Sequence, residues 1–453
     1  MQEIYRKFLS SRVLTSIFSS SIALKMTGGF LWLLAGIVPV RVASLIATVI
    51  VVRILGTSSY GEFCLARSTT GTFLVIATFG MGRASAKYIA EYLTRDLERV
   101  GNIVAANYLF TFITSGIVAF AFFWFAPFLC ENVFEIPHLV NETRFCVILL
   151  ITTTFVGVQS GVLAGFQAFR ETSIAGAISG ALSIPFFVLG AKYGGTLGAL
   201  IGFSTNSFIN ALINNIYISK LLKSRNVPFK FWNCWKERGV LWNFCLPSTL
   251  FSLCTSCVTW GISVLIVRQP NGSGELGILD AMRQIQTSIL YLPVLAMNVV
   301  VPVLSEINGR RDRTLFVKTA RGVVIINLLF TLVVSIIAAI FSSWIINAFG
   351  RGFEQAFWTL YVVLITCVVM SVTNVYGSIL TSLGALWIRF VLATLGGILS
   401  LIILCFCRNG LPASLNAAIA ILSANILQCV GYVIFANRAV ALRLKTDDDP
   451  LST

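Results

Sequence analysis

The chain has 453 residues, of which 57% are hydrophobic and only 11% are charged. Its mean hydropathy is +0.87, and no soluble protein could cover so much apolar surface with so few polar residues. The net charge of +15 would fit nucleic-acid binding, but the basic residues lie in short segments between apolar runs, so nucleic acid is not an expected partner. The sequence predicts an all-α integral membrane protein surrounded by membrane lipids.

The N-terminal segment, 1–27, contains basic side chains and an apolar stretch that polar residues interrupt. A cleaved signal peptide needs a uniform apolar centre and a small-residue cleavage site. Segment 1–27 lacks this pattern, and we expect it to form an amphipathic helix at the membrane interface.

Twelve apolar stretches follow, each near the roughly 20 residues that a membrane-spanning helix requires. They lie at residues 28–52, 62–82, 102–126, 145–167, 174–191, 196–219, 241–267, 276–303, 322–349, 357–382, 389–406 and 413–436. The predicted organisation is an N-terminal lobe at 28–219, a basic linker at 220–239, a C-terminal lobe at 240–437 and a tail at 438–453.

The basic residues between the spans predict the orientation, because cytoplasmic loops are enriched in Lys and Arg. If the N-terminus is cytoplasmic, the segments on that side hold most of the Lys and Arg side chains, and the segments on the other side hold only Arg53, Arg144, Lys192, Arg268, Arg351 and Arg408. Both termini are therefore predicted to be cytoplasmic. The number of spans must then be even, which agrees with twelve.

The same landmarks recur in the two halves of the chain. Arg53 ends the first span and Arg268 ends the seventh, and a glutamate follows at the same distance in each half, at Glu91 and Glu306. We expect two parallel six-helix repeats with a site between them near the membrane midplane, as in transporters. Arg53 and Arg268 would anchor the first helix of each lobe at the external interface.

Four charged residues lie inside predicted spans: Arg41, Arg67, Asp280 and Arg283. A charge at the bilayer centre costs about 2.5–3.5 kcal/mol, so each should face a cavity or a partner. Arg67 and Arg283 occupy equivalent places in the second span of each lobe, and guanidinium groups bind phosphate through paired hydrogen bonds. We predict an anion site there and place Arg41, just after Pro39, in the same cavity.

Two simpler interpretations of these arginines remain open. Arg283 could pair with Asp280 on its own helix face, and Arg41 could extend to the interface. Asn206, Asn210 and Asn374 could line a polar lumen or bond neighbouring helices.

The remaining reactive residues give no sign of catalysis. His138 is the only histidine, which excludes a histidine-based metal centre or triad, and the CxxC at 254–257 lies within a predicted span. We expect no metal, no cofactor and no catalytic residue.

The segments VVRILGTSSYGEFCLARS, ATFGMGRASAKYIAEY and GVLAGFQAFRE resemble the Wzx-type polysaccharide (O-antigen) flippases of the MOP superfamily. The resemblance implies a V-shaped pair of helical bundles that works by alternating access. It implies a bacterial inner-membrane protein, not an enzyme, that carries undecaprenyl-pyrophosphate-linked oligosaccharides for lipopolysaccharide, capsule or related glycans. Other polysaccharide assembly proteins would be partners.

Two other functions remain open. A drug exporter of the MATE type would bind cations, and more intramembrane carboxylates than Asp280 alone would be expected; Asp280 is nevertheless a candidate for ion coupling. A membrane-embedded polymerase would be expected to carry a large external loop, and an acyltransferase an active histidine. The longest predicted external loop, 127–144, is short and acidic.

Overall fold

The computed structural model describes residues 21–228, 245–309, 313–406 and 410–443. These ranges contain helices and no strand, and eight of their helices are long and apolar enough to cross a membrane. Together with α9 and α10, these eight make up the longer helices of the described ranges. The longer helices are α3 (Ser21–Thr78), α5 (Leu97–Phe128), α6 (Val140–Gly165), α7 (Phe169–Ser224), α9 (Leu246–Val267), α10 (Gly272–Gly309), α11 (Arg313–Ile340), α13 (Ala356–Ser382), α14 (Leu386–Phe406) and α15 (Ala413–Arg443). The short ones are α4 (Met81–Tyr92), η1 (Leu129–Val133), η2 (Pro137–Leu139) and α12 (Ser342–Phe349).

The described parts of all twelve predicted spans fall mainly on these helices; residues 241–244 of the seventh lie outside the described residues, and the second passes from α3 into α4. α3 and α7 each contain two spans, which meet at the non-helical residues Gly56 and Gly195. The boundaries differ from the prediction in places: the ninth predicted span is divided at Phe341 between α11 and α12, and α15 continues to Arg443. The protein is therefore an all-α, twelve-span membrane protein.

Several predicted segments lie partly outside the described residues. These are residues 1–20 of the interfacial segment, 229–239 of the basic linker, 240–244, 310–312 and 407–409 of the C-terminal lobe and 444–453 of the tail. The first residues of the predicted linker are helical, because α7 runs to Ser224.

The backbone itself repeats at a constant interval along the sequence. Residues with positive φ angles mark equivalent turns in the two halves, and the members of each pair are equally far apart: Gly56 (75°) and Asn271 (56°), Glu135 (60°) and Gly350 (99°), and Gly195 (56°) and Gly410 (69°). Glycine and asparagine adopt this left-handed conformation at least cost. The two halves are thus two six-helix repeats.

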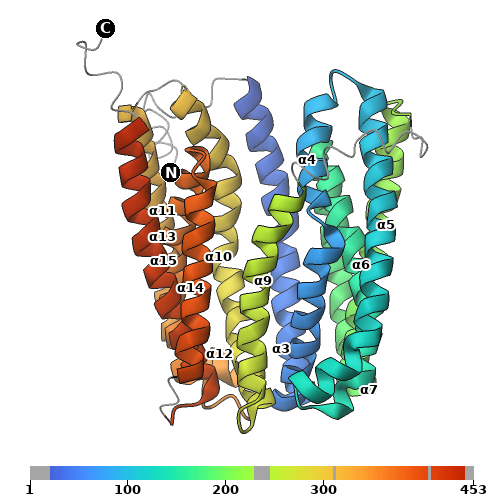
Figure 1. Cartoon of the computed structure of the whole chain (residues 1–453), viewed down its shortest axis with the longest axis vertical. Coiled ribbons are helices and arrows are strands. Elements are labelled where there is room, and N and C mark those ends of the chain that lie inside the picture. Colours follow the sequence, from blue (N-terminus) through green and yellow to red (C-terminus); the bar gives the residue numbers. More distant parts are fainter. Residues whose placement is uncertain (1–20, 229–244, 310–312, 407–409, 444–453) are drawn as a thin grey trace.

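The hydrophobic core shows how the two lobes meet. One continuous cluster joins both lobes near α12 and includes Val51 and Phe63 together with Leu279 and Phe349. Toward α4 the buried residues form smaller clusters: one lies within each lobe, and a third joins the lobes where Cys245, just before α9, packs against Met81 of α4. We call these two ends of the bundle the α12 end and the α4 end (Figure 1).

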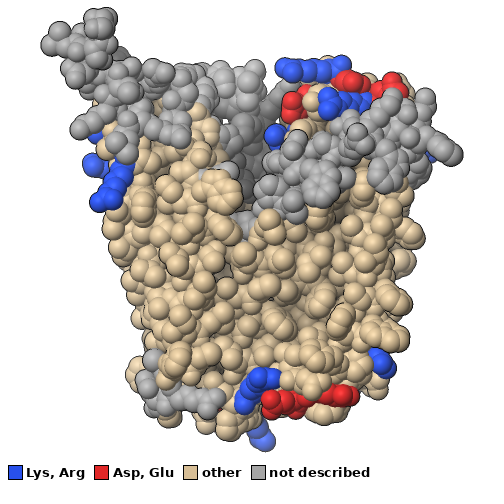
Figure 2. All heavy atoms as spheres, viewed as in Figure 1, with Lys and Arg blue, Asp and Glu red and all other residues tan. Residues whose placement is uncertain are grey.

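The lobes therefore share their largest core at the α12 end and pack together less extensively toward the α4 end. In Figure 2 the described Lys, Arg, Asp and Glu side chains gather toward these two ends and leave the middle of the face shown uncharged. In Figure 1 the helices α4 to α7 lie on one side and α10 to α15 on the other, with α9 between them. This is the V-shaped arrangement that the resemblance implies.

The outer surface of the bundle suits a lipid environment. Large apolar side chains are exposed along the spans, among them Phe112 and Phe120 on α5. Exposed tryptophans lie toward the helix ends, at Trp344 and Trp387, as is common where membrane helices meet the headgroups.

Candidate functional site between the lobes

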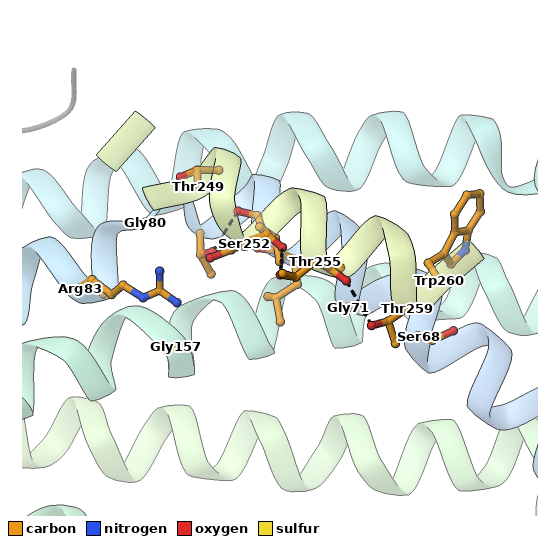
Figure 3. A pocket seen from close by; sticks show the side chains of 15 residues that line it. Ser68, Gly71, Gly80, Arg83, Gly157, Thr249, Ser252, Thr255, Thr259 and Trp260 are labelled. Carbon is orange, nitrogen blue, oxygen red and sulfur yellow. Dashed lines mark hydrogen bonds between the residues drawn. The ribbon is translucent and has the colours of Figure 1, made fainter. Parts of the chain in front are cut away.

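A cavity of about 650 Å³ lies where the second half of α3 faces α9. Arg83 stands at one end of it and Trp260 at the other (Figure 3). The lining residues are Ser68, Gly71, Leu74, Val75, Thr78, Gly80, Gly82, Arg83, Gly157, Thr249, Ser252, Thr255, Ser256, Thr259 and Trp260. α3 belongs to the first lobe and α9 to the second, so the cavity lies between the lobes.

Hydroxyl groups form one wall of this cavity. Thr249, Ser252, Ser256 and Thr259 follow one another on α9 at spacings of three or four positions, which places them on one helix face. The Thr249 hydroxyl donates to the Cys245 carbonyl at 2.7 Å. The Thr259 hydroxyl donates in the same way to the Thr255 carbonyl, at 3.1 Å. A hydroxyl that donates in this way can still accept hydrogen bonds at its oxygen.

This wall is not among the sites predicted from the sequence. The spacing of its hydroxyl residues is visible within 241–267, but Ser and Thr are common in membrane helices, where they bond their own backbone, so the pattern alone does not predict a site.

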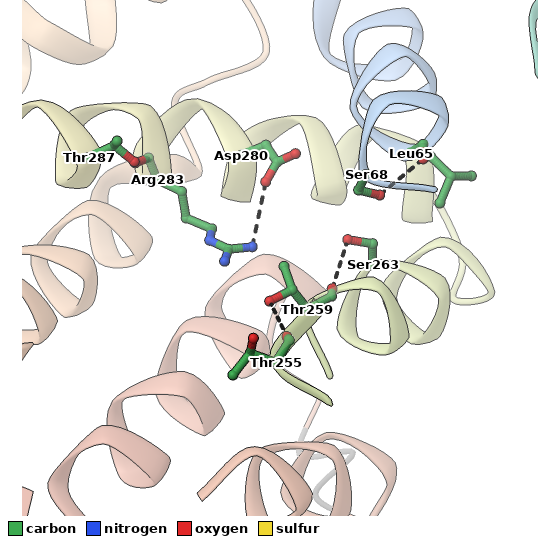
Figure 4. Close-up of polar contacts among 8 residues, drawn as sticks. All are labelled: Leu65, Ser68, Thr255, Thr259, Ser263, Asp280, Arg283 and Thr287. Carbon is green, nitrogen blue, oxygen red and sulfur yellow. Dashed lines mark hydrogen bonds and ion pairs between the residues drawn. The ribbon is translucent and has the colours of Figure 1, made fainter. Parts of the chain in front are cut away.

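Asp280 and Arg283 form an ion pair on α10, with 3.7 Å between Oδ1 and Nη1. Their side chains are largely shielded, with exposed fractions of 12% and 29%. In Figure 4 both point from α10 toward the side of α9 that carries Thr255 and Thr259. The predicted i,i+3 pair is therefore present, and it faces the hydroxyl wall.

Arg67 approaches the same carboxylate from the other lobe. Its guanidinium lies 5.6 Å from the centre of the Phe63 ring and interacts electrostatically with Asp280. Asp280 also accepts a hydrogen bond from the Cys64 thiol. The structure thus brings Arg67, Asp280 and Arg283 together at the contact between α3 and α10.

These residues are related at an interval one residue longer than that of the turns, because Gly61 of α3 and Gly277 of α10 contact each other's helix in the same way and an arginine follows each glycine by six positions. Arg67 comes three positions after Cys64 in the first lobe, and Arg283 comes three positions after Asp280 in the second. The two arginines are therefore equivalent, whereas the position equivalent to the carboxylate holds a thiol. The site carries two cations and one anion, which leaves a net positive charge.

Arg41 is not part of this group. Its guanidinium stacks 4.3 Å from the centre of the Tyr291 ring on α10. Tyr291 lies two helical turns beyond Arg283, which is about 12 Å along the helix. A second contact nearby, from Gln284 to Ser44 at 3.5 Å, also joins α10 to the first half of α3.

The three predicted lumen asparagines have different surroundings. Asn206 accepts a hydrogen bond from Ser179 at 3.4 Å, which links the two spans of α7. Asn210 and Asn374 are partly buried, and neither lines the cavity described above. Among the described residues, no group of His, Cys, Asp and Glu side chains is arranged to hold a metal ion.

Comparison with known proteins identifies the family. Residues 26–308, more than half of the chain, match the family described as polysaccharide biosynthesis protein. The chain belongs to this family. No curated protein sequence matches this polysaccharide biosynthesis protein.

Solved structures share its fold at low sequence identity. An inward-facing multidrug resistance MATE family transporter of the MOP superfamily has a TM-score of 0.75 and 14% identity, and the match covers 90% of this chain and 96% of that one. An outward-facing transporter of that family has a TM-score of 0.64 and 15% identity, with 92% and 96% coverage.

A third match is a MOP superfamily transporter from Pyrococcus furiosus, with a TM-score of 0.66, 16% identity and coverage of 92% and 96%. For that protein, a reversed polarity of the binding pocket suggests a different function. The polysaccharide biosynthesis protein described here therefore has the MOP transporter fold.

Proposed function

We propose that this protein is a flippase that moves an oligosaccharide linked to undecaprenyl pyrophosphate from the cytoplasmic to the periplasmic leaflet. The observation that carries the proposal is the arrangement of Arg67 and Arg283, one from each lobe, around Asp280. Two guanidinium groups that converge across a lobe interface suit a ligand with two adjacent phosphates.

The three parts of this substrate have different needs. The pyrophosphate needs cations, because transfer of a bare anion into an apolar core is very costly. The glycan needs hydrogen-bonding partners, and the acceptor-rich wall of α9 offers these to sugar hydroxyls. The polyprenyl chain needs neither and can remain in the lipid outside the cavity.

Alternating access supplies the movement in this proposal. The large core cluster joins the lobes at the α12 end, whereas at the α4 end a small cluster around Cys245 and Met81 joins them, so in this proposal the substrate enters from the α4 end. We place the α4 end in the cytoplasm, together with both termini, because the basic segments lie there. The higher TM-score to the inward-facing relative, 0.75 against 0.64, supports this assignment.

Two sources of energy fit the site. Outward movement of negative charge runs with a negative-inside potential, worth about 2.3 kcal/mol per charge per 100 mV. Alternatively, Asp280 takes up a proton or sodium ion and releases Arg283 to the substrate. After transport, enzymes in the periplasm must consume the glycan, and such assembly proteins are the expected partners.

Deleting the gene in its bacterial host tests the proposal. We expect a lipid-linked oligosaccharide to accumulate in the cytoplasmic leaflet of the inner membrane, with loss of O-antigen, capsule or a related polysaccharide. Structural analysis of the accumulated lipid would identify its sugar. Unchanged lipid-linked glycans and unchanged surface polysaccharide would contradict the proposal.

A MATE-like exporter is the second candidate, favoured by the fold of the solved relatives and by the intramembrane carboxylate of Asp280. Proteoliposomes separate the two functions. The flippase proposal predicts movement of a polyprenyl-pyrophosphate oligosaccharide and no counterflow of an organic cation dye. Dye transport without glycan transport would establish the exporter instead.

A further inference from the structure

Two arginines at the α12 end join the lobes. Arg53, in the first lobe, donates from Nε to the carbonyl of Ala348 and from Nη2 to that of Asn347, the latter at 2.8 Å. Arg268, in the second lobe, donates from Nε to the carbonyl of Val133 at 2.8 Å and from Nη2 to that of Asn132 at 2.7 Å.

The paired bonds to carbonyls are equivalent under the repeat, and Arg268 has in addition an ion pair with Glu135 at 3.5 Å, where the equivalent position beside Arg53 is Gly350. The interval from Arg53 to Arg268 equals the interval between their acceptors, and the same nitrogen bonds the same member of each acceptor pair. In each case an arginine that ends the first span of one lobe bonds carbonyls at the end of the third span of the other lobe. Such agreement of four bonds would not arise from side chains that merely extend toward the interface.

The acceptors suit a cation. They lie in the last residues of η1 and α12, where backbone carbonyls lack partners within the helix and carry partial negative charge. The flat guanidinium bonds two of them at once, which a lysine ammonium cannot do in the same geometry.

A direct backbone contact between α3 and α10 also closes the α12 end. A Cβ atom on Gly61 would overlap the carbonyl oxygen of Ser273, and one on Gly277 would overlap that of Thr57. Gly61 comes six positions before Arg67, and Gly277 comes six positions before Arg283, so the two glycines are equivalent. At these glycines α3 and α10 cross in direct backbone contact. The two arginine contacts flank this crossing.

We propose that Arg53 and Arg268 are a symmetric pair of latches that hold the lobes closed at the α12 end and must open together in each transport cycle. The latch bonds can break at little cost because the arginines are exposed and water can replace their acceptors. This inference concerns the gate alone and holds whichever substrate the protein carries.

Cys64 is a native reporter of the gate. It lies three positions beyond Gly61, is 0% exposed and bonds Asp280 across the lobe interface. It becomes accessible when the α12 end opens. In nanodiscs a membrane-impermeant maleimide reaches both faces of the protein, and peptide mass spectrometry gives its rate of reaction with each cysteine.

We expect Arg53→Gln and Arg268→Gln each to raise the labelling rate of Cys64 by about two- to fivefold. The effect of Arg268→Gln should be the larger of the two, because it also removes the ion pair with Glu135, and the double variant should show about the product of the two effects. Lys192→Gln removes an exposed cation at the α12 end whose described contact, with the Tyr193 ring, lies within its own lobe, and it should label like wild type.

The double lysine variant separates a latch from an anchor. Lysine keeps the interfacial charge but loses the paired bonds, so a latch predicts faster labelling of Cys64 and an anchor predicts the wild-type rate. Cys146 and Cys367, each buried within one lobe, should stay unreactive in every variant. A wild-type rate in the double glutamine variant, or equal labelling of all three cysteines, would overturn the proposal.

Discussion

Arg67 and Arg283 approach one carboxylate from opposite lobes, and their exchange of Asp280 for a phosphate is the central step of the proposed function. We expect Arg67→Ala and Arg283→Ala each to lower flipping by about ten- to a hundredfold, because each loses a charged hydrogen bond worth about 1.5–3 kcal/mol. Lysine should restore only part of the activity. The measurement is glycan export in cells, with protein level monitored.

Arg41→Ala is a matched control, because this arginine stacks on Tyr291 away from the Asp280 group. It should reduce flipping less than the other two substitutions. Normal transport by both the Arg67 and the Arg283 alanine variants would rule out the anion site.

Asp280→Asn distinguishes the two energy sources. If the membrane potential drives transport, the variant should flip the glycan at a near-normal rate in proteoliposomes and respond to an imposed potential. If Asp280 couples an ion, the variant should lose its response to an imposed proton or sodium gradient. A wild-type protein that ignores every gradient would refute both mechanisms.

At the scale of the helix, α9 contributes a wall of acceptors rather than a single ligand. We expect Thr255→Val and Thr259→Val each to reduce flipping by about two- to tenfold, because a neutral hydrogen bond contributes about 0.5–1.5 kcal/mol. Valine keeps the shape of threonine, so protein level should not change. Thr205→Val on α7 removes a similar hydroxyl, one that bonds Ile201 at 2.9 Å, outside the cavity. It should have no effect, and equal losses in all three variants would contradict the role of the wall.

The glycine crossing of α3 and α10 makes a different prediction. Gly61→Ala and Gly277→Ala should each destabilise this closed structure by about 1–3 kcal/mol, because the new methyl group meets backbone that cannot withdraw. Gly116→Ala on α5, which meets nothing within 4 Å, should be neutral or slightly stabilising. Thermal unfolding measured by fluorescence compares the three variants. Equal midpoints would show that the helices do not cross so closely.

At the scale of the whole molecule, the distribution of basic segments predicts the orientation. A reporter fused at residue 230, in the linker outside the described residues, should be cytoplasmic. A reporter at residue 135, near the α12 end, should be external. The same location for both would exclude the two-lobe topology in which the linker and the α12 end face opposite sides.

The twelve spans and the repeat could be predicted from the sequence because both are local patterns of hydropathy and spacing. The contacts that organise the site could not. Arg53 and its acceptors lie in opposite halves of the chain, and hydropathy does not show which end of the bundle is closed. The stacking of Arg41 on Tyr291 depends on the contact between α3 and α10, which hydropathy does not reveal either. The hydroxyl wall of α9 is different, since its spacing is visible in the sequence.

Cys64 occupies in the first lobe the position that Asp280 occupies in the second, so the two halves of the site are not identical. A perfectly two-fold clamp would accept a ligand equally well in either of two orientations, and a pyrophosphate diester offers two similar phosphates. With a carboxylate on one side only, the two arginines differ: one must first give up its partner on its own helix, and the other contacts that partner across the interface. In the proposed function, this single departure from internal symmetry would let the site distinguish the lipid end of a pyrophosphate-linked ligand from its sugar end.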